Sequence, residues 1–214
     1  MNKRVRIDFV SDVSCPWCVI GLMSLEEALR RMNGEVTADI HVQPFELNPQ
    51  LGVAGEDVAE HLMKKYGATA EQSARSREAI HARGKEVGFD FALDRRTRIY
   101  NTFDAHRLLH WAELEGRQND LKHALFAAYF SDGKNPSDHE VLVKIAASVG
   151  LDGTRARQIL ESDIYAKEVR ERERFYLERG IHAVPAVIIN ERHLIQGGQA
   201  PEVFEHAIRQ IASE

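Results

Sequence analysis

The 214-residue sequence contains only two cysteines and no long hydrophobic run. Two thiols cannot build the disulfide framework that small secreted proteins use in place of a large core. No window approaches the ~18 consecutive apolar residues that a membrane helix needs. Charged residues interrupt the apolar stretch near the N-terminus, which argues against a signal peptide. We therefore expect a cytoplasmic protein that does not bind a membrane.

An excess of positive charge is also missing. The chain has 28 Lys and Arg against 33 Asp and Glu, a net charge of −5, and the two signs are interleaved. A nucleic-acid-binding surface normally shows clustered basic residues, so that class of partner is excluded. Hydrophobic residues make up 43% of the chain, which is enough for a folded core and excludes disordered and collagen-like proteins.

Both ends of the chain show strand and helix patterns. Residues 5–10 form a short apolar run, helical spacing of apolar residues follows it, and residues 37–45 alternate as a second strand. Near the other end, residues 184–189 are rich in β-branched side chains, and a turn at 190–191 leads into a hairpin partner. Pro201 then suits the first turn of a final helix. These patterns predict β-α-β at the start and β-β-α at the end.

The middle of the chain is predicted to be helical throughout. Good helix formers with helical periodicity run from about residue 57 to residue 177. Capping boxes at Thr69–Gln72 and Ser137–Glu140 mark two helix starts. The expected division is a thioredoxin-like domain split into an N-terminal and a C-terminal part around an all-helical insertion domain, with bounds 1–50, 51–178 and 179–214.

The cysteines are spaced Cys-Pro-Trp-Cys directly after the first strand, at the start of the first predicted helix. Unpaired N–H groups and the helix dipole stabilise an anion there, so we expect Cys15 to react as an accessible thiolate nucleophile. Cys18 lies one turn further along and is positioned to resolve a mixed disulfide. Pro16 fits the first turn because its missing N–H would be unpaired anyway. A structural zinc site would need two further ligands, and no partner motif stands at matching range.

The sequence resembles the thioredoxin-fold DsbA-type oxidoreductases, and within them the FrnE-like branch. The resemblance covers essentially the whole chain and rests on residues 8–12, Cys15-Pro16-Trp17-Cys18, Gly21, Asn101-Thr102, Ala105-His106-Arg107-Leu108 and Val184-Pro185. It implies an α/β, thioredoxin-like fold. It also implies a cis peptide bond before Pro185, opposite the nucleophile, with the Val184 backbone pairing with a substrate chain.

Other residues are candidates for the substrate site. Trp17 is expected at the surface between the cysteines, where it offers an apolar contact. His106 and Asn101 are predicted to line a substrate groove, and Gly198 to hold a carboxylate on backbone N–H groups.

Further polar residues carry less specific signals. Asp8 has two open interpretations: a buried carboxylate that assists proton transfer from Cys18, or a solvent-facing strand residue. Asp12 is interpreted as a turn residue. His106 and His110 have the spacing of metal ligands on a helix, but no third ligand is apparent, so no metal is predicted.

The predicted function is thiol-disulfide exchange, as a reductase or isomerase in a reducing compartment. Disulfide-containing proteins or small molecules are the expected substrates, with no required cofactor and glutathione as a candidate co-substrate. One alternative is a glutathione-dependent isomerase or transferase, related to 2-hydroxychromene-2-carboxylate isomerase and kappa-class glutathione transferase. Another is a polypeptide-binding module with incidental thiols. The expected assembly is a monomer or a homodimer.

Overall fold

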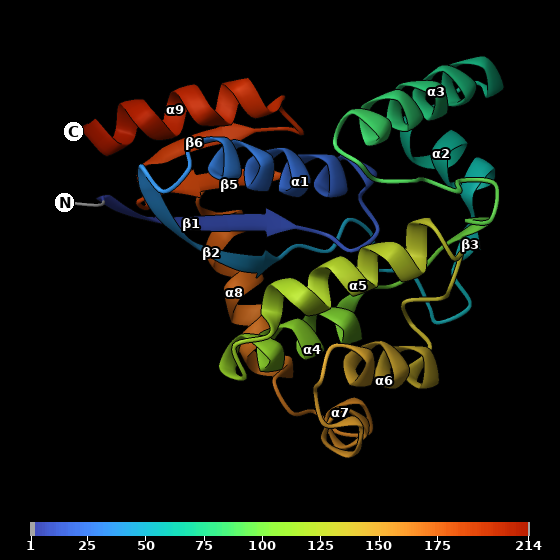
Figure 1. Ribbon diagram of the computed structural model, residues 1–214. Coiled ribbons are helices and arrows are strands. Elements are labelled where there is room, and N and C mark those ends of the chain that lie inside the picture. The colour runs from blue at the N-terminus through green and yellow to red at the C-terminus, as the bar shows by residue number, and fades with distance from the viewer. Residues whose placement is uncertain (1–2, 214) are drawn as a thin grey trace.

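A four-stranded sheet forms the centre of the protein, whose computed structural model describes residues 3–213 (Figure 1). The strand order is β2-β1-β5-β6, with β1 parallel to β2 and antiparallel to β5. The strands are β1 (Lys3–Ser11), β2 (Val36–Pro44), β5 (Ala186–Ile189) and β6 (His193–Gln196). The two ends of the chain therefore meet in one sheet, as the split β-α-β and β-β-α patterns predict.

Helices cover both faces of this sheet. Helices α1 (Pro16–Arg31) and α9 (Pro201–Ser213) lie side by side on one face (Figure 1). Ile7 and Phe9 of β1 point into the core beneath them, because alternate residues of a strand face opposite sides. Val10 faces the other side, where it packs with Tyr176 of α8 (Ala166–Glu178).

The segment between β2 and β5 is a helical insertion. Its further helices are α2 (Val58–Tyr66), α3 (Ala70–Glu86), α4 (Phe103–Leu114), α5 (Gln118–Phe130), α6 (His139–Ser148) and α7 (Gly153–Leu160). Helices α4 to α7 bury a second apolar core, which includes Val13 from the loop after β1. The α/β thioredoxin-like fold with a helical insertion is confirmed.

The insertion contains one element that helical periodicity does not indicate. Two short strands, β3 (Glu56–Asp57) and β4 (Arg98–Ile99), pair antiparallel at its edge. An "all-helical" description of the insertion was therefore incomplete, because two-residue strands are too short to leave a period in the sequence.

The two predicted capping boxes had different outcomes. Thr69 and Gln72 form one at the start of α3, as predicted. The helix start at Ser137 was wrong by one residue, since Asp138 caps α6 by accepting the N–H of Val141. The Ser137 hydroxyl instead donates to the carbonyl oxygen of Asn101.

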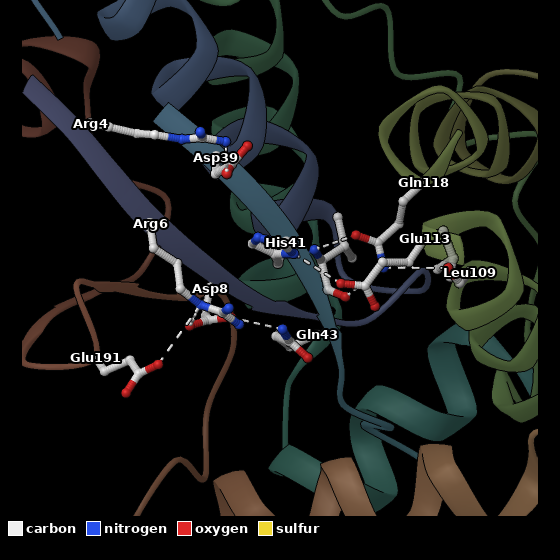
Figure 2. Close-up of polar contacts among 11 residues, drawn as sticks. Arg4, Arg6, Asp8, Asp39, His41, Gln43, Leu109, Glu113, Gln118 and Glu191 are labelled. Carbon is white, nitrogen blue, oxygen red and sulfur yellow. Dashed lines mark hydrogen bonds and ion pairs between the residues drawn. The ribbon is translucent and has the colours of Figure 1, made fainter. Parts of the chain in front are cut away.

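The helical insertion is fastened to the free edge of the sheet through β2. The Gln118 side chain at the start of α5 accepts the N–H of Val42 at 2.8 Å and donates to its carbonyl oxygen at 3.0 Å (Figure 2). His41 pairs with Glu113 of α4 at 2.9 Å beside it. These contacts give hydrogen-bond partners to backbone groups that an edge strand would otherwise leave unpaired, and they fix the position of α5.

No helix among residues 3–213 is both long and apolar enough to cross a membrane.

Candidate functional site

The two cysteines lie at the start of α1. Cys15 is the N-cap residue with extended backbone angles, and Pro16 occupies the first helical position. The Cys15 N–H donates to the carbonyl oxygen of Asp12 at 3.3 Å, and the Cys18 N–H donates to that of Cys15 at 3.1 Å. The thiols are therefore one turn apart, as predicted, and both are free.

Burial distinguishes the two thiols. Cys15 retains 4% of its surface exposed, whereas Cys18 is fully buried. Burial raises the pKa of Cys18 well above its usual value, the adjacent Cys15 raises it further, and the positive charge of Lys122 opposes them. An external disulfide therefore meets Cys15 first. Cys15 is nevertheless less accessible than the sequence predicts, because the turn before Pro185 lies against it.

The peptide bond between Val184 and Pro185 is cis, as the resemblance implies. The Cys15 thiol donates to the Val184 carbonyl oxygen at 3.7 Å. A β-carbon on Gly21 would lie 3.0 Å from Cγ of Pro185, so the missing side chain at 21 lets the proline pack against α1. The structure thus brings Cys15, Val184 and Pro185 together.

Gly198 joins the same cluster from the loop after β6. A β-carbon there would lie 2.9 Å from the carbonyl oxygen of Trp17, which explains why a glycine fits this position. Its carbonyl oxygen accepts Nη2 of Arg83 at 3.4 Å. Trp17 is half-buried and packs against the core, so the expectation of a surface-exposed tryptophan is only partly met.

The end of α2 supplies an aromatic residue that the sequence analysis missed. Tyr66 is 60% exposed, and Lys65 beside it donates to the carbonyl oxygen of Leu47 at 2.6 Å. Partial burial raises the pKa of Tyr66, and negative charge on Cys15 and Asp12 raises it further. Tyr66 therefore lies within electrostatic range of the thiol that a substrate meets first.

A buried carboxylate lies beneath the dithiol. Asp12 accepts the N–H of Leu47 at 2.7 Å and both the N–H and the hydroxyl of Ser14, at 3.1 and 3.0 Å. Nε2 of His106 lies 3.6 Å from its Oδ1. Burial alone would raise the pKa of Asp12, but His106 and the two N–H donors lower it to about 2. Asp12 makes the predicted turn and is also an internal negative charge.

Residues 6–209 match the DSBA-like thioredoxin domain family. The protein belongs to this family. It is a DsbA-like member with a Cys-x-x-Cys pair at Cys15 and Cys18.

A structure described as a "probable DsbA oxidoreductase" from Streptomyces coelicolor is 32% identical, with a TM-score of 0.90 over 98% of this chain and 91% of that one. An uncharacterized protein, YwbO, of Bacillus subtilis is 28% identical over 95% of this chain and 96% of its own. The cytosolic disulfide reductase DsbM from Pseudomonas aeruginosa, solved with GSH, shares the fold. It has 16% identity and a TM-score of 0.67 over 98% of this chain and 100% of that one.

In this DsbA-like protein Asp8 fits neither interpretation drawn from the sequence. It is buried, but it lies on the sheet face opposite α1 and the cysteines. Its carboxylate accepts Nη2 of Arg6 and Nε2 of Gln43, each at 2.8 Å (Figure 2). The sequence does not show which face of the sheet Asp8 lies on. In the folded protein, the buried acid near the thiols is Asp12 and not Asp8.

The structure contradicts the predicted groove position of His106, whereas Asn101 is half-buried and its groove position stays a prediction. His106 is 2% exposed, so it cannot line an open groove. The Asn101 amide donates to Glu46 and to the carbonyl oxygen of Pro49, each at 3.2 Å. Both residues therefore belong to a polar cluster inside the DsbA-like fold. His106 lies close to the buried Asp12 carboxylate from the loop after β1, and the sequence does not show such a contact between distant segments.

The same cluster contains a carboxylate pair that the sequence gives no sign of. Glu46 and Glu173 are both buried, and Arg170 donates to each of them. Burial and the charge of Glu173 raise the pKa of Glu46 to about 7, and burial also raises the pKa of Glu173. The two residues are 127 positions apart in the chain, so only the folded protein shows that they form a pair.

His106 and His110, which have the spacing of metal ligands, are not joined by further ligands. His110 packs its ring against Tyr165, with 5.0 Å between ring centroids. Within residues 3–213 no group of three or more His, Cys, Asp or Glu side chains has the arrangement of a metal site.

Proposed function

We propose that this protein catalyses thiol-disulfide exchange with Cys15 as the nucleophile and Cys18 as the resolving thiol. The carrying observation is the position of Cys15 at the N-terminus of α1, 3.7 Å from the Val184 carbonyl oxygen, with a fully buried Cys18 one turn behind it. Helix N-terminal N–H groups and the helix dipole stabilise the thiolate that the attack requires.

The reaction proceeds in two exchange steps. The Cys15 thiolate attacks one sulfur of the substrate disulfide, forms a mixed disulfide and releases the other sulfur as a thiolate that takes up a proton. Cys18 then loses its proton and attacks the sulfur of Cys15. The Cys15–Cys18 disulfide forms, the second substrate thiol leaves, and the substrate has gained two electrons from the dithiol.

The Val184 backbone lies beside the reacting sulfur, and we assign the exposed aromatic Tyr66 a role in apolar contact with the substrate. We assign the Val184 carbonyl the role of pairing with an extended substrate segment, which orients its disulfide over Cys15. Trp17 lies against Gly198, and Pro185 packs against Gly21 of α1, beside this site.

A reducing compartment favours the reductase or isomerase direction. A dithiol with a DsbA-like potential near −120 mV would remain reduced against a cytosolic poise of about −220 to −320 mV. The chain has no further cysteine, so regeneration falls to an external thiol. Glutathione is the candidate, and the GSH in the structure of the DsbM reductase supports this choice.

We place the protein in the FrnE-like branch of the family, on the motif residues that carry that resemblance. FrnE relatives with a second cysteine pair near the C-terminus would exchange electrons internally. The present chain would instead depend on its external thiol alone.

Insulin reduction with glutathione as reductant tests the proposal. Wild-type protein should reduce insulin, whereas Cys15→Ser should abolish activity and Cys18→Ser should accumulate a mixed disulfide through Cys15. Ser213→Ala, a hydroxyl at the end of α9, is the control and should match wild type. If both cysteine variants retain glutathione conjugation to an electrophile while wild type reduces no disulfide, the isomerase or transferase alternative replaces this proposal.

A further inference from the structure

A lysine is fully buried against the core cluster that contains both cysteines. Lys122 of α5 is 0% exposed, and its Nζ lies 4.7 Å from the centroid of the Phe126 ring. Among the residues that the structure describes, Nζ has no hydrogen-bond partner. Buried lysines are almost always paired, so an unpaired ammonium needs an explanation.

The packing of α5 determines where this side chain points. Gln118, one turn earlier, fixes α5 to the edge of β2, and His123 pairs with Glu26 of α1 at 2.8 Å. Figure 1 shows α5 next to the β2 edge of the sheet, which it contacts. Phe126, one turn after Lys122, belongs to the core cluster that contains both cysteines. Lys122 is thus held on the inner face of α5.

The charges that act on Lys122 come from the dithiol region. Burial lowers the pKa of Lys122 to about 8, and negative charge on Cys18, Asp12 and Cys15 acts in the opposite direction, with Cys18 the strongest. Reciprocally, Lys122 favours the thiolate form of Cys18. On its own helix the neighbouring His123 is paired with Glu26, so its charge is partly balanced.

We infer that Lys122 supplies the positive charge that stabilises the Cys18 thiolate while Cys18 resolves the mixed disulfide. The inference rests on the proposed function. In that step the Cys18 thiol gives up its proton, its sulfur bonds to the sulfur of Cys15, and the departing substrate sulfur takes up a proton. Lys122 keeps its own protons throughout and acts as a fixed counter-charge.

Neither Asp12 nor Asp8 can take this role. Asp12 is negative and would oppose a second negative charge at Cys18, and Asp8 lies on the far face of the sheet. The helix N-terminus acts on Cys15, at its first turn, more than on Cys18 inside it. A positive charge from the helical insertion therefore completes a site whose thiols come from the thioredoxin-like part.

Lys122→Met separates this role from a structural one. Methionine is also unbranched and fills a similar volume, but it carries no charge to desolvate, so the variant should be at least as stable as wild type at pH 7. If Lys122 only supported the fold, Lys122→Met would instead be less stable than wild type. Lys122→Leu repeats the test with a second apolar side chain. Lys144→Met, an exposed lysine on α6, is the matched control.

A symmetric aromatic disulfide as substrate separates the two exchange steps. Its first thiol leaves when Cys15 attacks and its second when Cys18 resolves, so rapid mixing follows each step in one protein. A nearby opposite charge shifts a pKa by about 1–3 units, so Lys122→Met should slow the second phase about tenfold or more at pH 7. Its pH profile should move to higher pH, and the first phase should change less.

Titration of thiolate absorbance in a Cys15→Ser background measures Cys18 alone and needs no substrate. Lys122→Met should raise the pH at which Cys18 ionises, and Lys144→Met should leave it unchanged. Folded Met and Leu variants with wild-type titration and a wild-type second phase would overturn the inference. If wild type shows no disulfide exchange, the proposed function fails instead, and the titration still decides whether Lys122 acts on Cys18.

Discussion

The thiol of Cys15 faces the carbonyl oxygen of Val184 at 3.7 Å, across the junction between the first helix and a loop from the other end of the chain. Two glycines permit this approach. Gly21 leaves room for Pro185 against α1, and Gly198 leaves room for the backbone of Trp17. The reacting geometry therefore depends on side chains that are missing as well as on those present.

Gly198→Ala should disturb the site. Its β-carbon would lie 2.9 Å from a backbone oxygen, so the loop or the start of α1 has to move. We expect a loss of about 1–3 kcal/mol in the free energy of unfolding, which is typical of overpacking, and slower alkylation of Cys15. Gly52→Ala is the control because its β-carbon would meet nothing within 4 Å. Equal stability of the two variants in urea titrations would contradict this explanation.

Asp12→Asn should change how the stability of the fold depends on pH. The pKa of Asp12 is about 2 in the folded protein, below its ordinary value. Its ionised form therefore stabilises the fold above pH ~4, by about 2 kcal/mol, and this contribution is lost as the pH falls through the folded pKa. Asp12→Asn should lose that contribution at pH 7 and show a flatter decline between about pH 4 and pH 2. Asp132→Asn, at an exposed position, should follow the wild-type curve in denaturant titrations.

The Glu46–Glu173 pair should give stability the opposite pH dependence from that of Asp12. Because the pKa of Glu46 is raised to about 7, its contribution to stability is complete below its ordinary pKa and decreases as the pH rises toward 7. Glu173→Gln removes the neighbouring negative charge, so the pKa of Glu46 should fall and this decrease should become smaller. Glu171→Gln on the same helix is exposed and serves as the control. Unfolding midpoints at pH 5 and pH 8 measure the difference.

Tyr66→Ala should weaken binding of protein substrates. An exposed aromatic near Cys15 offers apolar contact to a polypeptide but little to a small disulfide. Its loss should cost about 1 kcal/mol, or roughly a fivefold rise in KM for insulin. Reduction of glutathione disulfide should change much less. Phe175→Ala alters an exposed aromatic on α8, on the other face of the sheet, and should affect neither substrate.

Local patterns were sufficient to predict the scaffold and the dithiol. Residues 5–10 lie within β1, Pro201 begins α9, and the turn between β5 and β6 has Asn190 and Glu191 with positive φ. Each of these depends on residues close in the chain, so periodicity and turn chemistry indicate it. The Cys-x-x-Cys spacing placed both thiols on one helical turn for the same reason.

The buried charges could not be predicted because they depend on contacts between distant segments. Asp8 lies within β1 and Asp12 directly follows it, and only the packed sheet shows that Asp12 is the acid beneath the thiols. Glu46 becomes a member of a pair only when α8 packs near the loop after β2. Lys122 offered one usable signal, since helical spacing places it on the same face as Phe126 and Tyr129. A charge at such a position is unusual and can be searched for.

The arrangement of the sheet also affects how the protein matures during translation. Cys15 and Val184 are 169 residues apart in the chain. At about 5–20 residues per second, a ribosome that has added Cys15 needs roughly 8–34 s more to reach Val184. Throughout that interval the nascent chain carries two cysteines without the strand that flanks them. The exchange centre can therefore form only after residue 184 has been made, and chains that stop before it would carry unshielded thiols.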